Sequence, residues 1–173
     1  PSRCRQCGHR VRWYENIPII SYLALHGKCS SCKTTIGIRY PLVELVTAFV
    51  AGWCAYRYGW EWQALAWFFF GAMLICLTLI DWDTTYLPDS LTLPLLWAGL
   101  LLATVNATGI RLDSAVWGAA IGYLSLWSIY WGFKLLTGKE GMGFGDFKLF
   151  AALGAWFGVA ALIPIILMAA VIG

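Results

Sequence analysis

Long apolar runs occupy most of the chain and limit the folds that it can adopt. They cover residues 42–58, 62–80, 91–105, 115–136 and 147–172. A helix needs about 20 apolar residues, at about 1.5 Å each, to cross about 30 Å of hydrocarbon. The second, fourth and fifth runs are long enough, and the two short runs can cross where the bilayer thins. Since no run alternates with a period of two, the sequence predicts an all-α polytopic membrane protein with about five transmembrane helices.

The scarcity of charge supports a lipid environment. Charged residues make up 12% of the 173 residues, against about 25% in soluble domains, which is too few to coat a water-exposed globule. The chain also holds 11 Trp and 8 Tyr, residues that favour the membrane interface. We therefore expect the lipid bilayer to be a partner of this protein.

Lys and Arg residues are distributed unevenly along the chain. If residues 1–41 lie in the cytoplasm and all five runs cross, the inside segments are 1–41, 81–90 and 134–148. They hold seven, zero and three basic residues, whereas the outside segments hold only Arg57 and Arg111. This asymmetry is the one expected of cytoplasmic loops. It favours a cytoplasmic N-terminal segment over a nucleic-acid-binding one.

Residues 1–41 form a polar segment whose main feature is a pair of CxxC motifs. The cysteines are Cys4, Cys7, Cys29 and Cys32, with 21 residues between the two motifs, just beyond the usual range of about 15–20. Four thiolates suit a tetrahedral zinc ion. Disulfides are the alternative, but the cytoplasm is reducing. His9 and His26 are further possible ligands.

A four-sulfur shell leaves no open position for water, so the zinc would be structural. A segment of about 40 residues buries little core, and metal binding can supply folding free energy on the order of 10 kcal/mol. The sequence thus predicts two domains, a cytoplasmic zinc-binding domain over residues 1–41 and a transmembrane domain over residues 42–173.

Two acids stand at the cytoplasmic ends of apolar runs. Asp81 closes the second run, and Asp146 opens the fifth after Gly141, Gly143 and Gly145. A charge at membrane depth costs about 2.5–3.5 kcal/mol, so such acids are by default functional. Alternating glycines permit close backbone approach. Asp83 and Asp89 are equally well explained as solvated acids facing headgroup water.

A pair of neighbouring carboxylates shares a proton. One carboxylate can then take a proton from water while the other donates one to a carbonyl oxygen. This division of roles suits peptide hydrolysis and predicts an aspartyl protease centre at Asp81 and Asp146.

Short motifs in the N-terminal segment and around the two acids, in the family's order, resemble the type IV prepilin peptidases. The N-terminal segment carries the four cysteines together with Glu15-Asn-Ile-Pro18, Ser21, Gly27-Lys-Cys29, Arg39-Tyr-Pro41 and Glu44-Leu45. Asp81 is followed by Leu87-Pro-Asp89, and Gly143-Phe-Gly-Asp146-Phe-Lys148 resembles the family's second active-site segment. The resemblance extends over nearly the whole chain.

The resemblance implies a GxGD aspartyl protease of the bacterial inner membrane. Such enzymes cleave basic leader peptides from type IV prepilins and from the pseudopilins of type II secretion, at the cytoplasmic face. Many also methylate the new N-terminus with S-adenosylmethionine. The family's catalytic residues correspond to Asp81 and Asp146, and the methyltransferase candidates are Glu15, Gly27 and Lys28. No nucleic acid is expected as a partner.

The family usually has an apolar segment before the cysteines and more chain after the last span, so we expect this chain to be trimmed at both ends. Two other hypotheses remain open at this point. A proton- or cation-coupled transporter could use the same acids, but it would need them deep within the spans. A structural membrane subunit with a zinc knuckle would leave the paired acids without a role.

Overall fold

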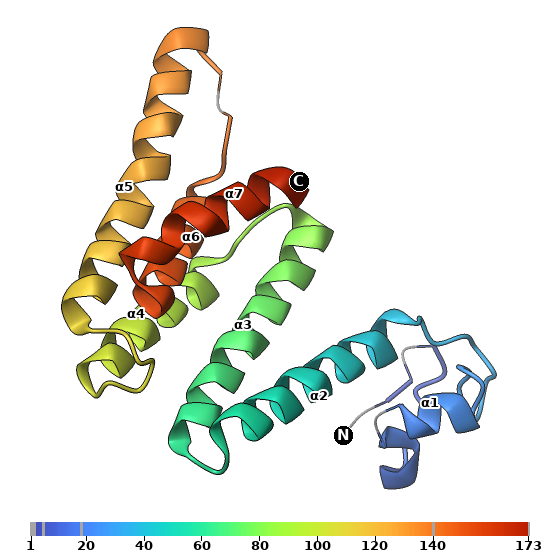
Figure 1. Ribbon diagram of the computed structural model, residues 1–173. Helices are drawn as coiled ribbons and strands as arrows, with labels where there is room; N and C mark the ends of the chain where they lie inside the picture. The colour runs from blue at the N-terminus through green and yellow to red at the C-terminus, as the bar shows by residue number, and fades with distance from the viewer. Residues whose placement is uncertain (1–2, 5, 18, 140, 173) are drawn as a thin grey trace. The chain divides into compact units, whose positions relative to one another are not determined.

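The computed structural model describes residues 3–4, 6–17, 19–139 and 141–172 (Figure 1). The described residues are helical, with two isolated β-bridges, Arg3–Arg10 and Lys28–Thr35, and no longer strand. The helices are η1 (Trp13–Asn16), α1 (Ile20–Ala24), α2 (Arg39–Tyr58), α3 (Trp62–Thr84), α4 (Asp89–Thr104), α5 (Leu112–Thr137), α6 (Phe144–Phe157), η2 (Val159–Ala161) and α7 (Leu162–Ile172). The all-α prediction is therefore confirmed for this part of the chain.

The chain divides into two compact units, Pro1–Tyr56 and Arg57–Gly173. The first unit holds the cysteines, η1, α1 and nearly all of α2, and the second holds the remaining helices. Helix α2 begins at Arg39, two residues before the predicted domain boundary. That boundary stays a prediction.

Helices α2 to α5 coincide with the first four apolar runs and extend each run by a few residues. Among the described residues, α3 is long and apolar enough to cross a membrane by length and composition. Helix α4 and the stretch Val159–Ile172 are apolar but shorter. Five transmembrane helices therefore remain a prediction, while one apolar spanning-length helix is a feature of the fold.

The fifth apolar run is not one helix, and the expectation of a continuous span over 147–172 is wrong. Helix α6 ends at Gly158, whose φ of 79° and ψ of 170° lie in a region that is essentially reserved for glycine. A Cβ at this position would also lie 2.7 Å from the Ser114 hydroxyl oxygen. The chain resumes as η2 and α7. Hydropathy alone does not reveal such a break, because every residue around it is apolar.

The second unit is organised around α6, which packs against both α4 and α5 (Figure 1). Helices α5 and α6 touch through their backbones, since a Cβ on Gly118 or on Gly154 would overlap the other residue's carbonyl oxygen. A Cβ on Gly122 would lie 2.8 Å from the Phe150 carbonyl oxygen. Gly118 meets Gly154, whereas Gly122, later in α5, meets Phe150, earlier in α6, so the two helices are antiparallel. Small residues at such crossings are typical of helix pairs in membranes.

Helices α4 and α6 run parallel, because one contact joins their starts and a second joins residues further along both helices. The buried Trp156 donates its indole N–H to the Leu95 carbonyl oxygen at 2.8 Å. Lys148 contacts Asp89, at the starts of the two helices. The Trp156 ring also packs against Phe70 of α3, with ring centroids 4.8 Å apart. The parallel arrangement brings the first turns of α4 and α6 to the same end of the unit.

Candidate functional site

The four predicted zinc ligands come together in the first unit. The Sγ atoms of Cys4, Cys7, Cys29 and Cys32 all lie within 4.8 Å of one another, and those of Cys4 and Cys32 are 3.8 Å apart. A tetrahedron with Zn–S bonds of about 2.3 Å has edges of about 3.8 Å. The cysteines are free thiols. Their geometry and chemistry therefore fit a zinc ion, and His9 and His26 are not part of the cluster.

Each CxxC motif forms the same backbone turn. In the first, the Gly8 N–H donates to the Cys4 carbonyl oxygen at 3.0 Å, and the Cys4 N–H donates to the His9 carbonyl oxygen at 2.9 Å. The second repeats both bonds around Cys29 and Lys33, at 2.8 and 3.1 Å. Gly8 and Lys33 occupy the same place in the two turns and share positive φ angles, 69° and 59°. The turns aim two thiols each at a common point.

Thr34 connects the two turns. Its hydroxyl donates to the Gln6 side-chain oxygen at 2.6 Å, and its oxygen lies 3.3 Å from the Cys32 Sγ. Hydrogen bonding with Thr34 lowers the pKa of the Cys32 thiol to about 6. A lower pKa favours the thiolate, which is the form that binds zinc.

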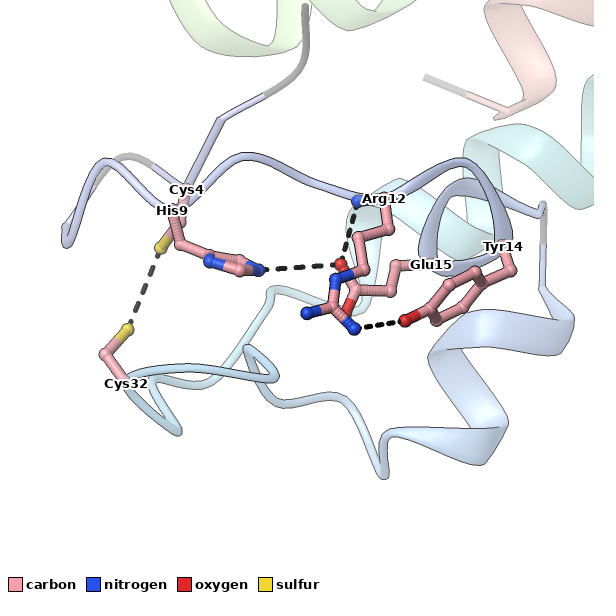
Figure 2. Close-up of polar contacts among 6 residues, drawn as sticks. All are labelled: Cys4, His9, Arg12, Tyr14, Glu15 and Cys32. Carbon is pink, nitrogen blue, oxygen red and sulfur yellow. Dashed lines mark hydrogen bonds and ion pairs between the residues drawn. The ribbon is translucent and has the colours of Figure 1, made fainter.

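Glu15 contacts His9 and Arg12, which follow the first CxxC motif along the chain, as Figure 2 shows. Its side chain is 9% exposed, and its Oε2 accepts the Arg12 backbone N–H at 2.9 Å. The His9 Nε2 lies 3.7 Å from the same oxygen. The Arg12 N–H, with further hydrogen bonding from Ser30, lowers the pKa of the Glu15 carboxyl. Glu15 is thus a nearly buried carboxylate that connects η1 with residues near both CxxC turns.

A cavity of about 900 Å³ opens in the first unit. It is lined by residues from η1, α1, the second CxxC turn and the start of α2, among them Glu15, Tyr22, Tyr40 and Glu44. Sequence reasoning gave neither tyrosine a role, although Tyr40 lies within the Arg39-Tyr-Pro41 motif, because neither belongs to a spacing pattern that marks a binding site. Only their convergence in the fold identifies them.

Of the three predicted methyltransferase residues, the structure brings only Glu15 into this cavity. Gly27 is buried with a φ of 67°, and a Cβ there would lie 2.9 Å from the Tyr22 ring. Lys28 is exposed and takes part in the bridge with Thr35. Pro18, quoted above with Glu15 as part of one motif, lies outside the described residues.

The two predicted catalytic aspartates stand at helix ends in the second unit. Asp81 is exposed in the last turn of α3, and Asp146 is partly buried in the first turn of α6. The Gly143 N–H donates to the Asp146 Oδ2 at 3.2 Å, which fixes this carboxylate over the helix start. The carboxylates of Asp81 and Asp146 are close enough to repel one another electrostatically.

The segments that carry these aspartates meet at Gly145. A Cβ on Gly145 would lie 2.6 Å from the Leu87 Cβ and 3.0 Å from the Leu87 carbonyl oxygen. Leu87 is buried in the loop between α3 and α4. Glycine is therefore required at position 145 by close backbone approach. Two segments about 60 residues apart along the chain form one layer at this end of the unit.

Asp89 and Lys148 form an ion pair across this layer. The Lys148 Nζ lies 2.6 Å from both carboxylate oxygens of Asp89. Asp89 is therefore not simply a solvated acid. Sequence reasoning missed this pair because its members are 59 residues apart. The opposite charges in the two active-site motifs were the signal that could have suggested it.

Comparisons with known proteins agree in both units. Residues 68–173 match the type IV leader peptidase family, and residues 1–58 match the bacterial peptidase A24 N-terminal domain. The chain is 53% identical to the prepilin leader peptidase/N-methyltransferase of Stutzerimonas stutzeri and 55% identical to that of Pseudomonas aeruginosa, each over 99% of this chain and 59% of the relative. The protein of the same name in Neisseria gonorrhoeae is 54% identical, over 99% of this chain and 60% of the relative.

No solved structure matches the chain significantly. The chain spans about six tenths of the length of these curated relatives.

Proposed function

Because the chain belongs to the type IV leader peptidase family, we propose that it carries the centre of an aspartyl endopeptidase that cleaves basic leader peptides from type IV prepilins and pseudopilins. The observation that carries the proposal is the meeting of the Asp81 and Asp146 segments at the Gly145–Leu87 contact. The names of the relatives point to the same class of substrate.

The proposed reaction needs two carboxyl groups in different protonation states. The ionised carboxylate takes a proton from water, whose oxygen attacks the carbonyl carbon of the scissile peptide bond. The protonated carboxyl donates its proton to the carbonyl oxygen, which gives a tetrahedral diol. The C–N bond then breaks as the leaving amine takes the proton that the first carboxylate received from water, and a hydroxyl of the diol returns its proton to the second carboxylate. The hydrogen bond from Gly143 orients Asp146 for this work. The glycines before it leave room for an extended substrate backbone.

We propose that the cleavage takes place at the cytoplasmic face of the bacterial inner membrane. Five membrane crossings would place Asp81, Asp146 and the cysteine cluster on one side, and the distribution of Lys and Arg favours the cytoplasm for that side. Helix α3 has the length and composition of a span. Large apolar side chains are exposed along the other long helices, as expected of a lipid-facing surface, among them Phe49, Trp97, Leu101, Trp117 and Leu124.

The cysteine cluster is proposed to hold a structural zinc ion through four thiolates, with no ligand position open for catalysis. The close approach of the four Sγ atoms, all within 4.8 Å of one another, supports this assignment. The ion would crosslink the two turns, in addition to the hydrogen bond between Thr34 and Gln6.

The cavity of the first unit is the proposed site for S-adenosylmethionine, the methyl donor that the methyltransferase part of the relatives' name requires. Its volume of about 900 Å³ lies in the range of small-molecule sites, about 300–1,000 Å³. Glu15 and Glu44 suit the positive sulfonium, and Tyr22 and Tyr40 offer aromatic faces to a cation. Gly27 would act through Tyr22, whose ring occupies the space of a Cβ. Lys28 remains a predicted residue of this site.

The deciding experiment measures leader cleavage of a purified prepilin by the full-length protein in detergent. We expect no detectable cleavage by Asp81→Asn or by Asp146→Asn, with wild-type expression and thermal stability. Asp113→Asn, in the first turn of α5, is the matched control and should cleave normally. Cleavage near the wild-type rate by either active-site variant would refute the proposed pair. The family match does not support the transporter alternative.

A further inference from the structure

The ion pair between Asp89 and Lys148 has no part in the proposed chemistry, yet its geometry is close. Both Asp89 carboxylate oxygens lie 2.6 Å from the Lys148 Nζ. The Lys148 side chain is 24% exposed and that of Asp89 is 51% exposed. Water and salt screen the attraction within a partly buried pair less than within a fully exposed one.

The pair stands next to the contact that joins the two active-site segments. Asp89 begins α4 two residues after Leu87, and Lys148 follows Asp146 by two residues in α6. The close approach of Gly145 to Leu87 lies just before the pair on both segments, two residues before Asp89 and three before Lys148. An ion pair at this position stabilises the contact between the start of α6 and the loop that follows Asp81.

The start of α6 needs such a restraint because the chain before it is glycine-rich. Gly141 and Gly143 give that chain wide conformational freedom. The bond from Gly143 to Asp146 is local and moves with the helix start. The Trp156–Leu95 hydrogen bond holds α6 to α4 eight residues further on, about 12 Å along the helix. Nearer to the first turn, the close approach of Gly145 to Leu87 and the buried Phe147 already supply apolar packing, and the Asp89–Lys148 pair adds a charged contact to the start of α4.

We propose that Asp89 and Lys148 are positioning residues that hold the first turn of α6 against the loop after α3, so that Asp146 stays within reach of Asp81. This inference rests on the proposed function. It assigns the pair no contact with substrate. A misplacement of about 1 Å at a reacting group can cost about 100-fold in rate, which sets the scale of the expected effect.

The test compares steady-state cleavage of a prepilin by the full-length protein and its variants. Asp89→Asn and Lys148→Met should each lower kcat roughly 10- to 100-fold, with KM within about twofold of wild type. The double variant should be no slower than the slower single variant, because both remove the same contact. The swap of Asp89→Lys with Lys148→Asp should recover part of kcat. Lys148→Arg, which keeps the charge, should keep most of the activity.

The matched control is Arg111→Gln. Arg111 and Asp113 also form a two-point ion pair, at 2.8 and 3.1 Å, but within one helix start. This variant should cleave like wild type. Thermal unfolding in the same detergent checks that each variant is folded, and Asp89→Asn, which breaks the same pair, decides the matter if Lys148→Met does not fold.

Three results would overturn the inference: single variants with kcat within about twofold of wild type, a raised KM with kcat unchanged, or a double variant slower by the product of the singles. The second would mean that the pair contacts the leader peptide. If the wild-type protein itself does not cleave, the proposed function fails instead, so the two failures are distinguishable.

Discussion

The crossing of α5 and α6 allows a prediction from one added methyl group. Gly122 is buried at this crossing, and a Cβ there would lie 2.8 Å from the Phe150 carbonyl oxygen. A carbon–oxygen contact normally needs about 3.4 Å, so Gly122→Ala is short of space by about 0.6 Å. The obstacle is a backbone atom of another helix, which cannot rotate away. The helices must separate, and the contacts on either side of the crossing weaken.

Gly132→Ala is the matched control, because Gly132 lies in the same helix with nothing within 4 Å of a Cβ. Both substitutions gain the same helix propensity, about 1 kcal/mol, so this term cancels when the variants are compared. Gly122→Ala then differs by the cost of overpacking, about 1–3 kcal/mol. For a chain of this size, 1 kcal/mol changes the unfolding midpoint by about 2–4 °C. We expect Gly122→Ala to unfold about 2–12 °C below Gly132→Ala.

The assay is thermal unfolding of the full-length protein in detergent, followed by tryptophan fluorescence at one heating rate. Gly118→Ala should be at least as unstable as Gly122→Ala, because its Cβ would overlap a carbonyl oxygen more deeply. If Gly122→Ala unfolds at or above the midpoint of Gly132→Ala, the helices do not cross with their backbones in contact and the reasoning fails.

Three further predictions concern the two sites. Gly145→Ala should reduce leader cleavage roughly 10- to 100-fold without unfolding the protein, because its Cβ would collide with Leu87 and move Asp146; cleavage at the wild-type rate would show that the contact is not needed. The protein should contain about one zinc ion per chain by atomic absorption, and Cys32→Ser should lose it while Cys54→Ser, a buried thiol outside the cluster, keeps it; zinc retained by Cys32→Ser would contradict the four-cysteine site. The pKa of Glu15 is lowered in the fold, so its contribution to stability is present above the unfolded value of about 4.3 and is lost as the pH falls through the folded value. Thermal unfolding of the wild type and Glu15→Gln should therefore differ at neutral pH and converge in acid, and a constant difference across pH would exclude this role.

The sequence predicted the features that depend on local pattern. Apolar length located four helices, and paired CxxC spacing located the cysteine cluster. The prediction that Asp81 and Asp146 share a layer followed from counting spans, and the structure brings their segments together at Gly145. These features were accessible because hydropathy and spacing act over short stretches of chain.

What the sequence could not supply was contact between distant residues. The cavity takes its tyrosines from α1 and α2, and the Asp89–Lys148 pair joins two helices. Gly27 was selected by motif, but its φ of 67° and its contact with Tyr22 explain it as a residue that shapes a turn. Such properties depend on backbone angles and tertiary packing, which a residue's type does not reveal.

The break at Gly158 limits how the protein can fit its bilayer. Helix α6 has 14 residues, a length of about 21 Å, against about 30 Å of hydrocarbon. A helix that begins at Phe144 and ends at Phe157 is too short to match an undisturbed membrane. In the proposed setting this hydrophobic mismatch thins the lipid around α6, or leaves the remaining depth to η2 and α7. Either way, water and headgroups approach Asp146 more closely than they would beside a full-length span, and the thickness of the surrounding membrane becomes a determinant of access to the site.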